Sequence, residues 1–312
     1  MAFFLTRRGA SPPFRRLSHA FGVLRPASPQ QQDGAGKARA RTRTTTWLLI
    51  APACLYIILV FLLPLVQVLV LSITDPVVSL QHYRRVFTTA LYLRVLGTTF
   101  RTAATVTLVC LLLGYPLAYV MARRGGKFAM GLLVIIGMSF WTSFLVRTYS
   151  WMVVLGAKGP VTAAARMLGF DQPPQLLFTT FASTLGMTHI LLPYMVMALY
   201  AVMKKIDTTH LRAAASLGAP PFQGFRHVFL PLSLPGVVNG CLLVFTLCLG
   251  FYVTPVLLGS PRDMMISQLI AQQVEELLAW GFASALSIVL LAATFTVLAL
   301  YTRFVGLDRL WG

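Results

Sequence analysis

The sequence predicts an all-α membrane protein with six transmembrane helices and a short additional helix between helices 4 and 5. Its mean hydropathy is +0.76, and 57% of its 312 residues are hydrophobic while only 11% are charged. In soluble proteins about a quarter of the residues are charged. The number of helices follows from runs without charged residues, each at or above the ~18 apolar residues that a spanning helix needs. These runs are 47–74, 102–122, 128–146, 172–203, 228–261 and 277–302.

Residues 1–46 precede these runs and are rich in Arg, Ser, Pro, Gln and Gly. They lack the apolar content of a packed domain, so we expect a disordered basic cytoplasmic tail. Residues 47–305 form the transmembrane domain, and residues 306–312 form a short cytoplasmic tail. Prolines within or beside the spans predict kinks rather than breaks, because neighbouring helices can satisfy the freed backbone groups. They are Pro52, Pro64, Pro116, Pro193, Pro235 and Pro255.

The distribution of Lys and Arg predicts the orientation, since cytoplasmic loops carry an excess of both. With six spans, 18 of the 26 basic residues fall on the side that holds both termini and the loop 204–230. Both termini and this loop are therefore expected in the cytoplasm. Most of the net charge of +18 lies on that side, which favours a topological origin of the charge over nucleic-acid binding.

The loop between the fourth and fifth runs predicts a short helix. Asp207 suits an N-cap, Gly218 suits the C-terminal stop, and Pro220-Pro221 prevents continuation. The spacing places Leu211, Ala214, Ala215 and Gly218 on one face of this helix. Most side chains on that face are small, so the groove of another protein could approach the backbone closely. The apolar anchors available are Leu211, Leu217, Phe222 and Phe225. An amphipathic helix lying on the membrane surface explains the same pattern.

This loop also carries a family resemblance. Ala213-Ala214, then Gly218, then nine residues, then Val228-Phe229-Leu230-Pro231 is similar to the "EAA" loop of ABC importer permeases. Two positions depart from the motif: Arg212 replaces its glutamate and Val228 its isoleucine, which puts any salt bridge of that glutamate in doubt. Further segments resemble the spermidine/putrescine-type permeases, and the likeness covers roughly 47–305. These segments are 139–151, 190–200 and 250–261.

The resemblance implies a permease subunit of an ATP-driven importer in the inner membrane of a bacterial cell. The loop would be the coupling helix that docks on the ATPase. Implied partners are a second permease subunit (a paralogue or another copy), two ATPase subunits and a periplasmic solute-binding protein. ATP would be used by the ATPase subunits, with no cofactor bound by this chain. The coupling residues would be Leu211, Arg212, Ala213, Ala214, Gly218, Phe222, Phe225 and Pro231.

Several enzyme motifs are incomplete or absent in this sequence. Gly125-Gly126-Lys127 lacks the remainder of a phosphate-binding loop, and the sequence contains neither a nucleophile elbow nor an HExxH helix. The Cys and His spacings do not suggest a metal site. We expect a protein that is not an enzyme. Since none of the eight acidic residues falls deep in a span, proton coupling is disfavoured and an external energy source is expected.

Polar and aromatic residues in or near the outer ends of spans are candidates for the substrate pathway. The pathway set is Thr142, Ser143, Arg147, Tyr149, Trp151, Asn239 and Tyr252. The outer-mouth set is Asp171, Asp263, Glu275 and Glu276, where carboxylates would gather a cationic substrate. Simpler roles compete: an aromatic interface belt for the tyrosines and Trp151, an interhelical hydrogen bond for Asn239, snorkelling or an acidic partner for Arg147, and solvation for the carboxylates.

We expect import of a small solute, with a polyamine such as putrescine or spermidine as the leading candidate. Two alternatives stay open. One is the same kind of importer acting on an opine, an amino acid or an anion. The other is a channel or secondary carrier without an ATPase, which the coupling loop and the missing membrane acids disfavour.

Overall fold

The computed structural model describes residues 29–75, 77–170 and 174–305. Within these ranges the chain forms helices and connecting turns without any strand, which confirms the predicted all-α class. The chain divides into two compact units, residues 1–64 and residues 65–312.

Helix α1 (Pro29–Thr74) begins in the first unit and ends in the second. Its apolar part, Ile50–Thr74, is long and apolar enough to cross a membrane, as predicted. The helix also includes residues 29–46, so this part of the predicted disordered tail is helical in the structure. The rest of that tail, residues 1–28, and the predicted C-terminal tail at 306–312 lie outside the described residues.

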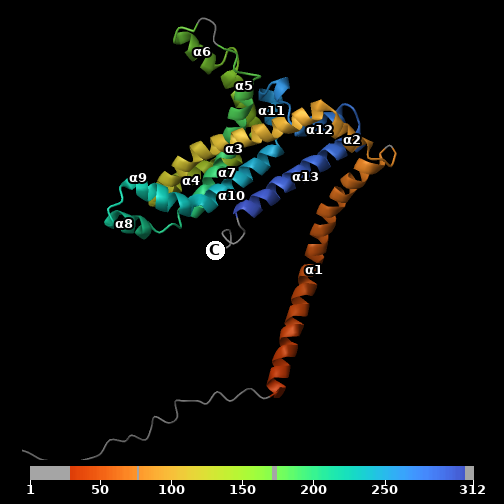
Figure 1. The fold of residues 1–312 in the computed structure, drawn as a ribbon, viewed down its shortest axis with the longest axis vertical. Coiled ribbons are helices and arrows are strands. Elements are labelled where there is room, and N and C mark those ends of the chain that lie inside the picture. The colour runs from red at the N-terminus through yellow and green to blue at the C-terminus, as the bar shows by residue number, and fades with distance from the viewer. Residues whose placement is uncertain (1–28, 76, 171–173, 306–312) are drawn as a thin grey trace, which may run out of the picture. The chain divides into compact units, whose positions relative to one another are not determined.

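Three long helices form the main core of the second unit (Figure 1). They are α3 (Ala90–Arg124), α7 (Thr180–Met203) and α10 (Leu230–Leu249). Met195 of α7 lies between glycines of the other two: a Cβ on Gly114 would come 3.1 Å from its Cγ, and a Cβ on Gly240 would come 2.7 Å from its Sδ. Small residues let membrane helices approach closely, so these glycines fix the spacing of the core.

The predicted kinks and boundaries hold in part. The helices continue through Pro52, Pro64, Pro116, Pro193 and Pro235, as expected for kinks rather than breaks. Helix α3, however, begins at Ala90 rather than at residue 102. Its 35 residues are about 52 Å long, which exceeds the ~30 Å hydrocarbon core of a bilayer, so its charged outer turns can remain in water.

The third predicted span, 128–146, is not a straight helix. Helix α4 (Gly126–Trp141) ends at an extended residue, Thr142, and α5 (Phe144–Leu155) continues in a new direction toward α6 (Pro160–Met167). The two parts are bent by 94°. By length and composition, the described residues therefore contain five helices able to span a membrane, or six if the bent pair forms one span.

The fifth predicted run, 228–261, is also divided. It is preceded by α9 (Pro221–Gly224), and its pieces and the segments that follow lead into the last long helix. In chain order these are the π-helix η1 (Phe225–Phe229), α10, α11 (Val253–Leu258), the 3-10 helix η2 (Pro261–Asp263), α12 (Ile266–Glu275) and α13 (Trp280–Val305).

A second apolar cluster joins α2 (Gln81–Thr88), the start of α3, α12 and α13. The Asp75 carboxylate accepts a hydrogen bond from the Gly281 backbone N–H at 2.9 Å. The Phe282 ring packs edge-on against Tyr92 at 5.1 Å between ring centroids, and the Arg85 guanidinium lies 4.7 Å from its centroid. These contacts fix the start of α13 and hence the turn between α12 and α13.

Candidate functional site

The predicted helix in the loop 204–230 is present as α8 (Thr208–Ser216). The Asp207 carboxylate accepts from the backbone N–H and from the hydroxyl of Thr209, both at 2.8 Å. These two hydrogen bonds lower the pKa of Asp207, because they stabilise the charged form. At the other end Leu217 is the C-cap and Gly218 has φ +84°, a conformation suited to glycine. Both predicted caps are confirmed.

The face of α8 that the sequence assigned to docking is used partly inside the chain. Leu211 is half-buried at the edge of the main core, and a Cβ on the buried Gly224 of α9 would lie 3.7 Å from its Cδ2. Ala214 is half-buried as well, whereas Arg212 and Ala213 are exposed. The small face therefore packs on its own loop along one edge, because α9 folds back beneath it.

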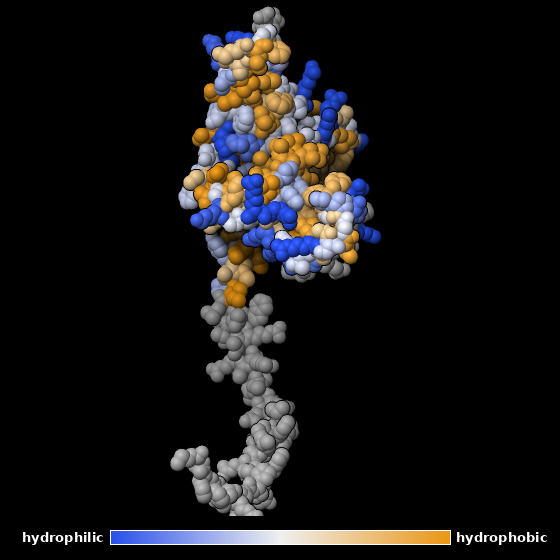
Figure 2. All heavy atoms as spheres, turned by 90° about the vertical axis from the view of Figure 1, so that its left-hand side faces the viewer, coloured by the Kyte–Doolittle hydropathy of each residue, from blue (hydrophilic) through white to orange (hydrophobic). Residues whose placement is uncertain are grey.

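The four predicted anchors separate into two pairs. Leu217 and Phe222 are 89% and 70% exposed, so both present apolar side chains at the surface. Phe225, which we expected to be an anchor, instead lies inside with Leu211. Figure 2 faces the end of the molecule that carries α8 and α9, where hydrophilic side chains lie among apolar ones. Pro231 is exposed in the first turn of α10.

Phe225 belongs to a group of rings, here called the aromatic clasp, that joins the loop to α3. Its ring meets Tyr119 edge-on at 5.5 Å and stacks on Phe229 at 6.0 Å, and Phe229 meets Tyr119 at 4.9 Å. The Tyr115 hydroxyl shares a 2.9 Å hydrogen bond with Ser233 of α10. These contacts tie the loop that carries α8 and α9 to α3 and α10.

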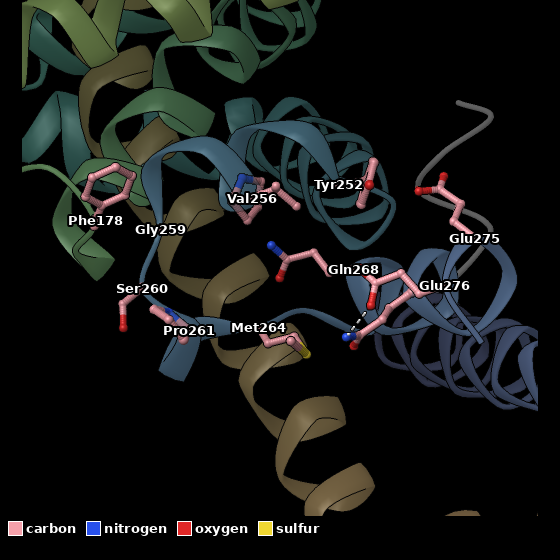
Figure 3. A pocket seen from close by; sticks show the side chains of 12 residues that line it. Phe178, Tyr252, Val256, Gly259, Ser260, Pro261, Met264, Gln268, Glu275 and Glu276 are labelled. Carbon is pink, nitrogen blue, oxygen red and sulfur yellow. Dashed lines mark hydrogen bonds between the residues drawn. The ribbon is translucent and has the colours of Figure 1, made fainter.

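A cavity of about 600 Å³, here called the outer cavity, brings together Tyr252, Glu275 and Glu276 of the predicted set (Figure 3). In Figure 3 the Glu275 carboxylate points toward Tyr252. The Gln272 amide donates to Glu276 Oε2 at 3.0 Å. None of the described residues that line this cavity is basic, although the chain carries 26 Lys and Arg. They are Phe178, Tyr252, Pro255, Val256, Gly259, Ser260, Pro261, Met264, Gln268, Gln272, Glu275 and Glu276.

The sequence analysis did not single out Phe178, Gln268 or Gln272. A sequence pattern could have predicted the two glutamines, because Gln268, Gln272 and Glu276 recur at i, i+4 and i+8 and so share one face of α12. No such pattern predicts Phe178, since it comes from the turn before α7. Its φ of +61° is unusual for a bulky residue, and such strain is tolerated mainly where the surrounding structure imposes it.

A second cavity of about 260 Å³, here called the aromatic cavity, shares Tyr252 with the first. The sequence analysis missed its other members. It is lined by Phe144, Gly250, Phe251, Tyr252, Val253 and Thr254.

Asp263, another of the outer-mouth acids, lines neither cavity. The Asp263 carboxylate accepts from the Thr180 hydroxyl at 2.7 Å. Asp171 lies outside the described residues.

The remaining pathway residues line neither of these two cavities. Thr142 and Ser143 form the bend between α4 and α5. Arg147 donates from Nη1 to Ser139 Oγ at 3.2 Å, and the Trp151 indole N–H donates to His189 Nδ1 at 3.0 Å, while Tyr149 is 54% exposed.

For Asn239 the simpler interpretation was an interhelical hydrogen bond. It is exposed, whereas the neighbouring Gly236 and Gly240 face α7. An interhelical hydrogen bond within the described chain is therefore not its role.

Sequence comparisons with known proteins find membrane components of transport systems. Residues 114–306 match the family of the "binding-protein-dependent transport system inner membrane component". The spermidine/putrescine transport system permease protein PotB of Salmonella typhimurium is 36% identical over 233 residues, which cover 74% of this chain and 81% of that protein. The PotB of Haemophilus influenzae is 34% identical, with 72% and 79% covered.

More distant matches have other solutes in their names. The molybdenum transport system permease protein ModB of Mycobacterium bovis is 33% identical over 53% of this chain and 61% of that protein. A chain in the crystal structure of a bacterial alginate ABC transporter with its alginate-bound periplasmic protein has a TM-score of 0.75 at 14% identity. The structural match covers 88% of this chain and 98% of that chain, so the two chains share a fold.

Proposed function

The chain belongs to the family of binding-protein-dependent transport system inner membrane components, and we propose that it imports a linear polyamine as a transmembrane subunit of an ATP-driven importer. It performs no chemistry of its own. The observation that carries the substrate class is the outer cavity. Its described lining contains two carboxylates and no basic residue, in a chain with a net charge of +18.

The charge of this cavity favours a cation over the solutes of the more distant relatives. An acidic cavity raises the local concentration of cations and repels anions such as molybdate or alginate. The relatives named for spermidine and putrescine cover most of this chain, whereas the relative named for molybdenum covers about half. Charge and similarity thus support the same substrate class.

Coupling to ATP takes place through α8 and α9. Leu217 and Phe222 supply the exposed apolar contacts for a groove on an ATPase subunit, and Arg212 adds a positive charge where the motif has a glutamate. The aromatic clasp carries the resulting movement to α3 and α10. Two ATPase subunits, a second permease subunit and a periplasmic binding protein complete the importer, with α8 and both termini in the cytoplasm.

In this scheme the binding protein releases the polyamine at the outer cavity. The exposed carboxylates hold it weakly, because charges open to water attract each other little. Weak holding suits transport, since the solute must leave again, and high affinity is supplied by the binding protein.

Uptake of labelled spermidine by cells that express the complete importer tests this function. We expect ATP-dependent accumulation that unlabelled putrescine reduces and molybdate does not. An importer that accumulates only anionic or neutral solutes would overturn the proposed substrate while leaving the family assignment intact.

A further inference from the structure

Tyr252 lines two cavities of different chemistry. The outer cavity is also lined by Glu275 and Glu276, and the aromatic cavity is also lined by Phe144 and Phe251. Tyr252 is 36% exposed and Phe144 is 45% exposed, so both rings are open to a solute. A molecule in the outer cavity can therefore contact a ring that also borders the aromatic cavity.

The aromatic cavity lies where two helix breaks face each other. Phe144 follows the bend at Thr142, and Gly250 to Tyr252 separate α10 from α11. Non-helical backbone at membrane depth is tolerated where it is buried in protein or lines a water-filled cavity. Two such breaks at one cavity indicate a compartment that admits a polar solute.

Polar contacts hold the two breaks in place. A buried hydrogen bond of 3.1 Å joins the hydroxyls of Thr148 on α5 and Thr254 on α11. The Ser267 hydroxyl of α12 donates to the backbone carbonyl of Phe251. The compartment is therefore fixed to α12, the same helix that presents the carboxylate end of the outer cavity.

We propose that the two cavities form one bipartite site for a linear polyamine, with Tyr252 in contact with the middle of the solute. This inference rests on the proposed function and extends it to the position of the solute. One ammonium lies at Glu275 and Glu276, while the adjoining methylenes and the next ammonium pass Tyr252 toward Phe144 and Phe251. Aromatic faces attract ammonium groups and also pack against methylenes, which matches the alternation of the two along a polyamine.

The site then distinguishes solutes by length. Spermidine, with three amino groups, is long enough to occupy both compartments, whereas a short diamine occupies mainly the outer one. Tyr252 and Phe144 are on this basis specificity-determining residues for the long solute.

The test uses the complete importer in proteoliposomes and compares initial uptake rates of labelled spermidine and 1,2-diaminoethane. Tyr252→Leu and Phe144→Leu should slow spermidine uptake by about three- to tenfold, the size of a lost ammonium–ring contact, and affect the short diamine less. Tyr252→Phe, which keeps the ring, should retain the parent's rate. Phe295→Leu is the matched control, because this exposed phenylalanine of α13 lines neither cavity.

ATP hydrolysis stimulated by the binding protein, measured on the same preparations, shows whether each variant is folded and coupled. If the parent transports spermidine and both leucine variants match it, or if they slow both solutes equally, the bipartite site is wrong while the proposed function stands. A parent that accumulates neither polyamine would overturn both proposals.

Discussion

Glu275 and Glu276 are exposed carboxylates, so their effect on a cation should depend on salt. Replacing both by Gln should slow uptake of putrescine or spermidine, more at low than at high ionic strength, because exposed charges are screened over ~10 Å at 0.1 M salt. Uptake rates at two salt concentrations measure this. Asp263→Asn is a suitable control, since Asp263 bonds Thr180 and lines neither cavity. Equal rates for the double variant and the parent at low salt would contradict the prediction.

Asp207 acts through its charge and its position as a cap. Because its pKa is lowered in the folded protein, the stabilisation it gives α8 is fully present above the unfolded pKa and is lost as pH falls through the folded one. Asp207→Ala should weaken α8 and reduce co-purification of the ATPase at neutral pH, whereas Asp207→Asn should retain much of it, since Asn is an equally good N-cap. Equal co-purification by the alanine variant and the parent would contradict a capping role.

At the scale of the element, α8 depends on Gly218 to end it. Gly218 has φ +84° and open space around its Cα, so a larger residue is opposed by the backbone rather than by a clash. Gly218→Leu should reduce ATPase co-purification and transport while membrane insertion stays normal. Gly218→Asn should be much milder, because Asn tolerates this conformation. Unchanged co-purification and transport in the leucine variant would speak against α8 as the docking element.

In the proposed coupling, docking and movement use different residues of one loop. Leu217 and Phe222 are free to contact another protein, whereas Phe225 and Phe229 are packed against Tyr119 of α3. Aromatic pairs in edge-on contact add about 0.5–1.5 kcal/mol beyond their burial. The π-helical turn η1 aims these two rings at α3, and π-turns are frequent at functional positions.

For the whole molecule the orientation in the membrane can be measured with single cysteines in a variant that lacks the four native ones. Val78 is 74% exposed and precedes α2, and Gln223 is exposed in α9. In spheroplasts, Val78→Cys should react with an impermeant thiol reagent, and Gln223→Cys should react only after the membrane is opened, because the proposed orientation places the basic loops in the cytoplasm. The reverse labelling pattern would contradict the predicted topology.

The sequence by itself determined the features that depend on neighbouring residues along the chain. Apolar runs are local, and so are the caps of α8 at Asp207 and Gly218, because a cap involves only the nearest backbone groups. The all-α class, most of the spans and both caps were therefore predicted correctly. The sequence did not reveal the bend within the third predicted span, because the bend after Trp141 depends on how α5 packs on α7 and α11, which hydropathy does not report.

Only the tertiary structure decided which polar and aromatic residues act together. Tyr252 meets Glu275 and Glu276 at one cavity, Phe225 turns inward onto α3, and Asn239 faces outward. These outcomes depend on packing between helices far apart in the sequence, and a hydropathy pattern is the same whether an aromatic ring faces lipid, another helix or a cavity. For the same reason the sequence did not predict that Phe144 and Phe178 line cavities, since these cavities are formed by segments far apart in the chain.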